Sequence, residues 1–130
     1  ILHELFYKHT FVKTRPNFLR YPLSGKNLEL DWFCEELRIG VEYHGRQHYE
    51  YIPHFHRNGR SDSVEQKNRD EYTAKACEEN DVYLVIVPYF YTYEDKETMK
   101  RFIRCRFQKL CNDNNEIREH TTLSPNISLQ

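Results

Sequence analysis

The segment VEYHGRQHY, which begins at Val41, combines three side chains that can bind a metal ion or move a proton. Glu42 supplies a carboxylate, and His44 and His48 supply imidazoles, which change charge near neutral pH. The first half of the segment alternates as a strand does, with Val41 and Tyr43 on an inner face and Glu42 and His44 on the other. This pattern predicts a chemical site at the end of a strand.

Asp31 brings a second carboxylate to the same region. It lies in an alternating stretch that a short link joins to residues 38–44, which predicts an antiparallel hairpin. In that hairpin Asp31 faces residues 40–42, and like charges opposite each other destabilise a ladder. Mg²⁺ (or Mn²⁺) would remove the repulsion, because it binds carboxylate, carbonyl and water oxygens. We therefore predict a metal site on Asp31, Glu42 and a nearby main-chain carbonyl; the alternative is that both carboxylates simply face solvent.

The spacing Asp31…Glu42-x-His44 is similar to the D…(D/E)-x-K arrangement of metal-dependent nucleases, with His in the place of Lys. Phosphodiester hydrolysis uses a metal to polarise the phosphate and to generate hydroxide. It also uses a group that transfers a proton, and His suits that role near neutral pH. The three residues together favour phosphodiester cleavage.

Hydrophobic periodicity predicts helices and strands in the order α-β-β-α-β-α. We expect helices over residues 1–9, 63–79 and 94–112, and strands over residues 28–33, 38–44 and 81–89. This order predicts an α/β (α+β) fold in which a small mixed β-sheet is flanked by helices.

The sequence also predicts how one strand is buried, where the second helix begins and which face of the third helix packs on the sheet. The strand DVYLVIVPY is the most apolar run, which predicts a central strand buried on both faces. Ser61 or Ser63 is expected to cap the second helix. The third helix is expected to face the sheet with Met99, Phe102, Ile103, Phe107, Leu110 and Cys111.

Length and composition set broad limits. The 130 residues fit one domain, which we expect to comprise a catalytic part at 1–112 and a polar, flexible tail at 113–130. The cysteines form no C-x-x-C pair and no eighteen-residue apolar run occurs, so we expect neither a cysteine-only zinc site nor a membrane span. Scattered cysteines without a secretory signal fit an intracellular location, in the cytoplasm, nucleoid or nucleus of a host. The net charge of −1 identifies no partner, and the oligomeric state is not predicted.

The stretches ELDWFCEELRIGVEYHGRQHY and RDEYTAKACEENDVYLVIVPY resemble the very short patch repair (Vsr-like) endonucleases. They are more similar still to the EDxHD homing endonucleases and their phage or viral cousins. Both groups belong to a branch of the PD-(D/E)xK nuclease fold, so the resemblance implies a restriction-endonuclease-like core. It covers about residues 1–90, with the short motifs in the same order and at compatible spacing.

The resemblance also implies roles for individual residues. It implies a catalytic set of Glu4, Asp31, His44, His48 and Asp70. Asp31 and the main-chain carbonyl of Tyr43 would bind the metal. Glu42 stands where the repair enzymes carry an apolar residue and where the broader fold carries its second metal carboxylate. The structural zinc cysteines of the repair enzymes are absent from the sequence, which favours a homing or phage-type nuclease over a mismatch-repair enzyme.

The stretch YEYIPHFHRNGR interleaves aromatic and basic residues, a combination that is typical of nucleic-acid contact. The candidate DNA-binding residues in this stretch are His54, His56, Arg57 and Arg60; Gln47 joins them because it resembles the Gln-His pair of other small nucleases of this fold. Two alternatives remain for this region: a mobile surface loop, and a zinc site built from the four histidines of residues 44–56. Asp70 could orient an imidazole through a hydrogen bond, or it could be an ordinary surface residue of a helix.

These observations lead to one principal hypothesis. We expect a metal-dependent DNA endonuclease catalytic domain that hydrolyses phosphodiester bonds, of homing-endonuclease or phage/viral type. Its partner would be DNA and not a membrane, and it would use Mg²⁺ (or Mn²⁺) without a small-molecule cofactor. The alternatives are a non-catalytic DNA-binding module that retains the nuclease fold, and a zinc-stabilised structural domain.

Overall fold

The computed structural model describes residues 2–6, 8–91 and 93–113 of the chain. The predicted tail at 113–130 therefore lies outside the described residues, apart from Asp113, which ends the last helix. No helix in the described ranges combines the length and the apolar character needed to span a bilayer.

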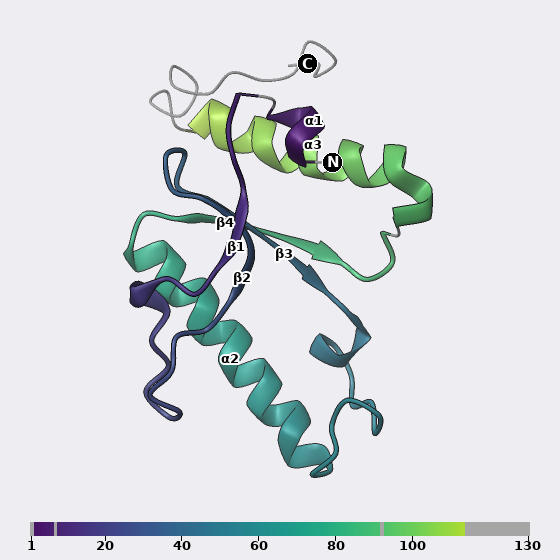
Figure 1. The fold of residues 1–130 in the computed structure, drawn as a ribbon. Coiled ribbons are helices and arrows are strands. Elements are labelled where there is room, and N and C mark those ends of the chain that lie inside the picture. Colours follow the sequence, from purple (N-terminus) through teal and green to yellow (C-terminus); the bar gives the residue numbers. More distant parts are fainter. Residues whose placement is uncertain (1, 7, 92, 114–130) are drawn as a thin grey trace.

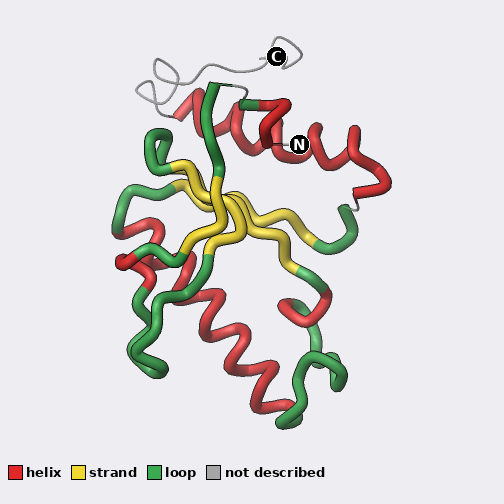
Figure 2. Tube along the Cα trace, viewed as in Figure 1, coloured by secondary structure: helices red, strands yellow, loops and turns green. Residues whose placement is uncertain are grey.

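The described residues form three helices and four strands (Figures 1 and 2). The helices are α1 (Leu2–Leu5), α2 (Arg60–Glu79) and α3 (Lys96–Asp113). The strands are β1 (Val12–Thr14), β2 (Leu30–Cys34), β3 (Ile39–His44) and β4 (Tyr83–Pro88). Short 3₁₀ turns lie at Asn17–Leu19, Arg46–His48 and Tyr93–Asp95.

The four strands form one sheet in the order β1-β2-β3-β4. The pairs β1–β2 and β2–β3 are antiparallel, and β4 joins β3 in parallel after the crossover through α2. The predicted mixed sheet and the hairpin are both confirmed. The last pair of the β2–β3 ladder is Trp32 with Val41, so Asp31 lies next to a residue paired within the predicted range of residues 40–42.

The helices cover both faces of the sheet, α1 and α3 on one side and α2 on the other (Figure 1). Alternate residues of β3 serve the two layers: Ile39 and Val41 pack in the α1–α3 cluster, whereas Glu42 and His44 point to the α2 side. The second cluster packs Ala76 of α2 against β2. The amphipathic pattern of β3 thus gives one face to the core and the other to the site.

The third helix packs through the residues that its period predicts. Met99, Ile103 and Phe107 recur every four positions and are all buried. Phe107 meets Phe6 edge-on, with ring centroids 4.7 Å apart. Phe102 packs partly buried against the same cluster, while the side chains of Leu110 and Cys111 lie outside the part of the chain that the structure describes.

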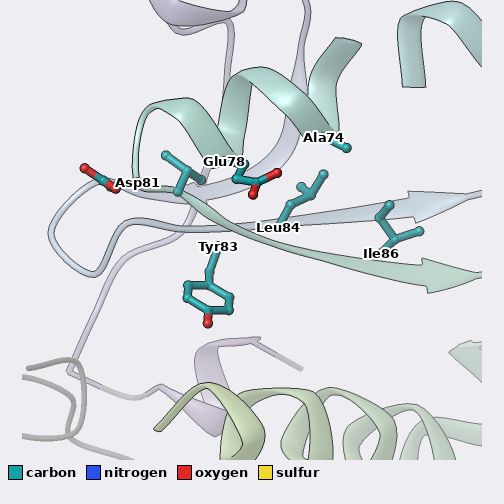
Figure 3. Close-up of a pocket in the computed structure, with 7 residues that line it drawn as sticks. Ala74, Glu78, Asp81, Tyr83, Leu84 and Ile86 are labelled. Carbon is teal, nitrogen blue, oxygen red and sulfur yellow. The ribbon is translucent and has the colours of Figure 1, made fainter. Parts of the chain in front are cut away.

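The strand β4 corrects one prediction. It lies at the edge of the sheet and not at its centre. The strand is apolar because α3 covers one of its faces and α2 the other. A central strand would be covered on both faces in the same way. No other strand in the described residues pairs with its outer edge, and a groove there is lined by residues of β4 and the C-terminal half of α2, among them Ala74, Leu84 and Ile86 (Figure 3).

Other boundaries also differ from those predicted. The helix α1 ends at Leu5, and the chain then forms β1, which was not predicted because three residues carry little periodicity. The helix α2 starts at Arg60, after Gly59 with φ +87°, so neither Ser61 nor Ser63 is the N-cap. Tyr43 was expected in the core, but 39% of it is exposed, because β3 extends beyond the apolar cluster there.

Candidate active site

His44 and His48 lie together at the end of β3. His44 is the last residue of the strand, and His48 closes the 3₁₀ turn that follows it. Their rings stack with centroids 4.0 Å apart and planes inclined by 11°. Gly45 precedes the turn in an extended conformation, and the side chain of Gln47 lies over it. The local sequence His-Gly-x-x-His therefore brings two imidazoles into contact.

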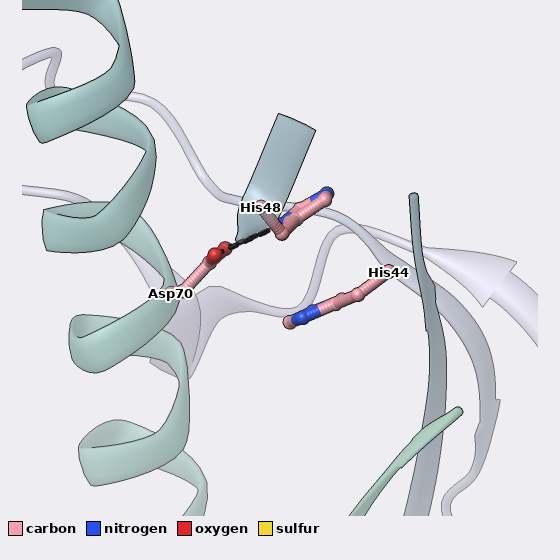
Figure 4. Close-up of side chains that lie close together, drawn as sticks. All are labelled: His44, His48 and Asp70. Carbon is pink, nitrogen blue, oxygen red and sulfur yellow. Dashed lines mark hydrogen bonds and ion pairs between the residues drawn. The ribbon is translucent and has the colours of Figure 1, made fainter. Parts of the chain in front are cut away.

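Asp70 reaches this pair from α2 (Figure 4). Nδ1 of His48 lies 2.8 and 3.0 Å from the two carboxylate oxygens of Asp70. A carboxylate only accepts, so Nδ1 carries the proton and Nε2 of the neutral ring is left as an acceptor. Gln66, one turn earlier on α2, donates to the same carboxylate at 3.2 Å. The aspartate is thus held on both sides, and it fixes the orientation of His48.

Glu42 forms the matching pair with His44. Nε2 of His44 lies 2.9 Å from Oε2 of Glu42, and only 6% and 12% of these two side chains are exposed. By the same reasoning Nε2 carries the proton and Nδ1 is the free acceptor. The site therefore contains two stacked imidazoles, each bonded to its own carboxylate. Burial strengthens such charge-assisted hydrogen bonds, because little water competes for them.

Asp31 lies beside this arrangement but outside the cluster. Its Oδ2 accepts a hydrogen bond from the main-chain N–H of Tyr43 at 2.9 Å. The ladder between β2 and β3 ends at Trp32 and Val41, so the carboxylate takes the place of the next main-chain acceptor. In an antiparallel strand the N–H and C=O of one residue face the same neighbour, so the Tyr43 carbonyl points toward β2 as well.

Within the described residues, one group of three side chains could bind a metal through nitrogen and oxygen. The ligand atoms of His44, His48 and Asp70 all lie within 4.8 Å of one another. The four histidines of the loop do not assemble into a zinc site. His54 is exposed, and its ring contacts the ring of Phe55. His56 is buried at a different place in the loop.

The remaining predicted residues lie in α1, in the turn after β3 and in the loop that leads into α2. Glu4 lies in α1, but its side chain is outside the part that the structure describes. The side chain of Gln47 lies close over Gly45, and Arg57 is exposed. Arg60 stacks on Tyr51, with its guanidinium carbon 4.8 Å from the ring centre.

His56 does not suit the phosphate contact that the sequence suggested. Only 3% of it is exposed, and its Nδ1 accepts a hydrogen bond from the N–H of Ile52 at 2.9 Å. The ring stacks on Tyr51, and Nε2 has no hydrogen-bond partner among the residues that the structure describes. The interior position gives His56 a role in holding the loop together.

Sequence reasoning missed Tyr49, which lies next to the histidines. Its ring meets His44 edge-on with centroids 6.4 Å apart. Partial burial raises the pKa of Tyr49, and the nearby charge of Asp70 adds to the effect. Its position directly after His48 was the available signal, but a tyrosine in an aromatic-rich loop is not distinctive.

Comparisons with known proteins find relatives among viruses. No family model matches the chain, and no solved structure matches it either. The chain is 45% identical over 86 residues to "Uncharacterized protein 033L" of Invertebrate iridescent virus 3, an alignment that covers 66% of this chain and 44% of the relative.

Two further viral proteins match a similar share of the chain. "Uncharacterized protein 307L" of Invertebrate iridescent virus 6 is 48% identical over 84 residues, covering 61% of this chain and 42% of the relative. "Uncharacterized protein 094L" of Frog virus 3 is 43% identical over 79 residues, covering 61% of this chain and 51% of the relative. The chain therefore aligns with about half the length of these viral relatives.

Proposed function

We propose that this chain is the catalytic domain of a metal-dependent DNA endonuclease related to the EDxHD homing branch of the PD-(D/E)xK fold. The observation that carries the proposal is the pair of stacked imidazoles at the end of β3, each bonded to its own carboxylate. When one of the two rings is protonated and the other is neutral, the pair can give up one proton and take up another, which hydrolysis of a phosphodiester requires. A mixed sheet with helices on both faces is compatible with this fold.

The oxygen atoms around Asp31 fit a hard divalent cation. One carboxylate oxygen of Asp31 is bonded to Tyr43, and the other has no hydrogen-bond partner in the described part of the chain. The Tyr43 carbonyl faces the same side, and Glu42 has a second oxygen that His44 does not use. Mg²⁺ prefers such oxygen ligands. When bound, Mg²⁺ (or Mn²⁺) would supply the positive charge that polarises a phosphate and acidifies water.

The histidines would do the proton transfer. Asp70 holds the proton of His48 on Nδ1, so Nε2 can accept a proton from the attacking water. Glu42 would stabilise a His44 ring that is protonated on both nitrogens, so that Nδ1 of His44 gives its proton to the leaving oxygen while His48 keeps the proton taken from water. Because the two rings stack on each other, the two proton transfers would occur at neighbouring positions.

The loop before α2 would contact the DNA backbone. Arg57 and His54 are exposed, and Arg60 lies over the ring of Tyr51 at the start of α2. Basic side chains beside aromatic rings suit phosphate contact and stacking. Gln47, on the turn between the two histidines, is the closest of the predicted contact residues to the proposed site in sequence.

Plasmid nicking tests the proposal. Supercoiled DNA is incubated with Mg²⁺, with EDTA, and with the variant Asp31→Ala, and nicked product is measured on a gel. We expect Mg²⁺-dependent nicking that falls at least 100-fold in Asp31→Ala. The control is Glu35→Ala, which removes an exposed carboxylate from the same hairpin. Equal nicking by wild type and Asp31→Ala would refute the metal site.

The cluster of His44, His48 and Asp70 favours a second candidate, a zinc-binding domain. Two imidazoles and a carboxylate within 4.8 Å suit Zn²⁺ better than Mg²⁺. Metal analysis of the purified protein and thermal melting with a chelator separate the two. Stoichiometric zinc, with a melting temperature that falls on chelation, would support this candidate, and its absence would favour the nuclease.

A non-catalytic DNA-binding module is the remaining alternative. It predicts salt-sensitive DNA binding, because phosphate contacts release counterions. It also predicts no divalent-dependent cleavage and unchanged binding in His44→Ala. The nicking assay, together with a binding titration at two salt concentrations, distinguishes it from the nuclease.

A further inference from the structure

Four surface aromatic residues form a continuous group next to the proposed site, which we call the aromatic series: Tyr43, Tyr49, Tyr89 and Phe90. Between 37% and 65% of each is exposed. They come from two places in the sequence, the end of β3 with the turn after it, and the segment that follows β4. Because β3 and β4 are parallel neighbours, both segments begin at the same end of the sheet, where the two strands finish (Figure 1).

Ring contacts connect the aromatic series to the histidines. Tyr49 meets His44 with centroids 6.4 Å apart, and Tyr89 lies 5.6 Å from Tyr49. Phe90 lies 5.8 Å from Tyr89, and it is the most exposed of the four. The chain of contacts therefore runs from a residue of the proposed site to open solvent.

Ring contacts with the core and one hydrogen bond position the aromatic series. Phe90 contacts Tyr91 at 4.9 Å, and Tyr91 contacts Phe102 of α3 at 4.6 Å, where both pack against the core. The hydroxyl of Tyr43 donates to the carbonyl of Tyr89 at 3.0 Å. Rings that are fixed before a ligand arrives lose little entropy on binding.

We propose that the aromatic series stacks on unpaired bases, so that the substrate is DNA with a single-stranded segment next to the scissile phosphate. This inference rests on the proposed nuclease function. Exposed aromatic rings offer flat faces that stack on any base, whatever its identity. Bases inside a duplex are covered by their neighbours, whereas unpaired bases have free faces.

The position of the aromatic series favours a nucleic-acid strand over a protein partner. The series begins at a ring in contact with His44, so a strand lying along it would continue directly from the phosphate at the site. Three of the four rings are tyrosines, whose hydroxyl groups keep the surface compatible with water when nothing is bound. A protein docking patch would not need to start at the proposed catalytic residues.

Fluorescence anisotropy with labelled DNA tests the inference without cleavage. The background is Asp31→Ala, so that the DNA stays intact during titration. Affinity is measured for a forked duplex with a single-stranded arm and for a blunt duplex of the same paired sequence. The test variant is Tyr89→Leu/Phe90→Leu, and the matched control is Tyr83→Leu. Tyr83 is 42% exposed but lies at the opposite end of β4, about 20 Å along the strand from Tyr89.

We expect the double variant to bind the forked DNA about 5- to 100-fold more weakly, which is the range for losing one or two stacked bases. Binding of blunt duplex should stay within twofold, and Tyr83→Leu should bind both DNAs as the parent does. A 2-aminopurine in the single-stranded arm should be quenched by the parent and not by the variant. Circular dichroism melts check that each variant folds, and Tyr49→Leu serves as a second test variant.

Three results would overturn the inference. The first is equal binding of forked DNA by parent and double variant, and the second is an equal loss for forked and blunt DNA. The third is a self-association that the double variant abolishes without any change in DNA binding, which would identify a protein interface. If the wild type nicks DNA but the double variant does not weaken binding of forked DNA, this inference is refuted and the nuclease proposal stands. Series-dependent binding without nicking refutes the nuclease proposal alone.

Discussion

The variant Asp70→Asn isolates the contribution of one negative charge to the proposed site. The side chain keeps its shape and can still accept from His48, but it no longer carries a charge. In the structure, Nδ1 of His48 lies 2.8 and 3.0 Å from the two Asp70 oxygens, and only 17% and 22% of the two side chains are exposed. A hydrogen bond to a charged group contributes about 1.5–3 kcal/mol. Each 1.36 kcal/mol in the barrier is a factor of ten in rate.

We therefore expect Asp70→Asn to nick supercoiled plasmid about 10- to 100-fold more slowly at saturating Mg²⁺. The free energy of unfolding should change by less than about 1 kcal/mol, because Asn can keep the hydrogen bonds to His48 and Gln66. Glu71→Gln is the matched control, since it removes an exposed charge at the next position of α2. Its nicking rate should equal that of the wild type.

A double-mutant cycle then asks whether Asp70 acts through His48. In a His48→Ala background, Asp70→Asn should cause no further slowing, because the residue it orients is already gone. An unchanged rate in Asp70→Asn, or a full additional loss in the His48→Ala background, would refute the reasoning. The first result would mean that the charge is not used, and the second that Asp70 acts on something else.

Three further predictions concern the fold. Phe107→Ala should lower the free energy of unfolding in urea by about 3–5 kcal/mol, because the ring is buried against Phe6; a loss below 1 kcal/mol would contradict this packing. Burial raises the pKa of Cys77 to about 12, so its thiol stays protonated at pH 8. Iodoacetamide should therefore label Cys105 in the native protein and Cys77 only after unfolding, as read by peptide mass mapping; equal labelling would be inconsistent with the structure. Gly59→Ala should destabilise the protein by about 1–2 kcal/mol in the same urea assay, because φ of +87° disfavours a side chain, and no change would show that the backbone relaxes there.

The open edge of β4 illustrates how an apolar run can mislead. The residues Tyr83–Pro88 carry no charge, and such a run is typical of a central strand. The cause here is different, since α3 covers one face and α2 the other, while no strand of the described residues pairs with the outer edge. Periodicity reports which faces are buried and contains no information on whether a strand has one neighbour or two.

The local sequence determined much of the site. The alternation of β3 assigned Ile39 and Val41 to the core and Glu42 and His44 to the opposite face, because side chains of a strand alternate by geometry alone. The short hairpin link fixed the register of the β2–β3 ladder, whose last pair, Trp32 with Val41, directly precedes the two carboxylates in space. These predictions depend on neighbours within a few residues, and they were confirmed.

Only the tertiary structure decided how the polar groups pair. Asp70 is 22 residues from His48 in sequence, and the crossover of α2 behind the sheet brings their side chains together. Glu42, which the sequence suggested as a metal ligand, also accepts a hydrogen bond from His44 through one of its oxygens, a pairing that the sequence did not indicate. His56 contacts Ile52 and Tyr51 within the loop and does not join His44 and His48, although all three lie within thirteen residues. Such pairings depend on the angle at which a helix crosses a sheet, and no local pattern of residues encodes that angle.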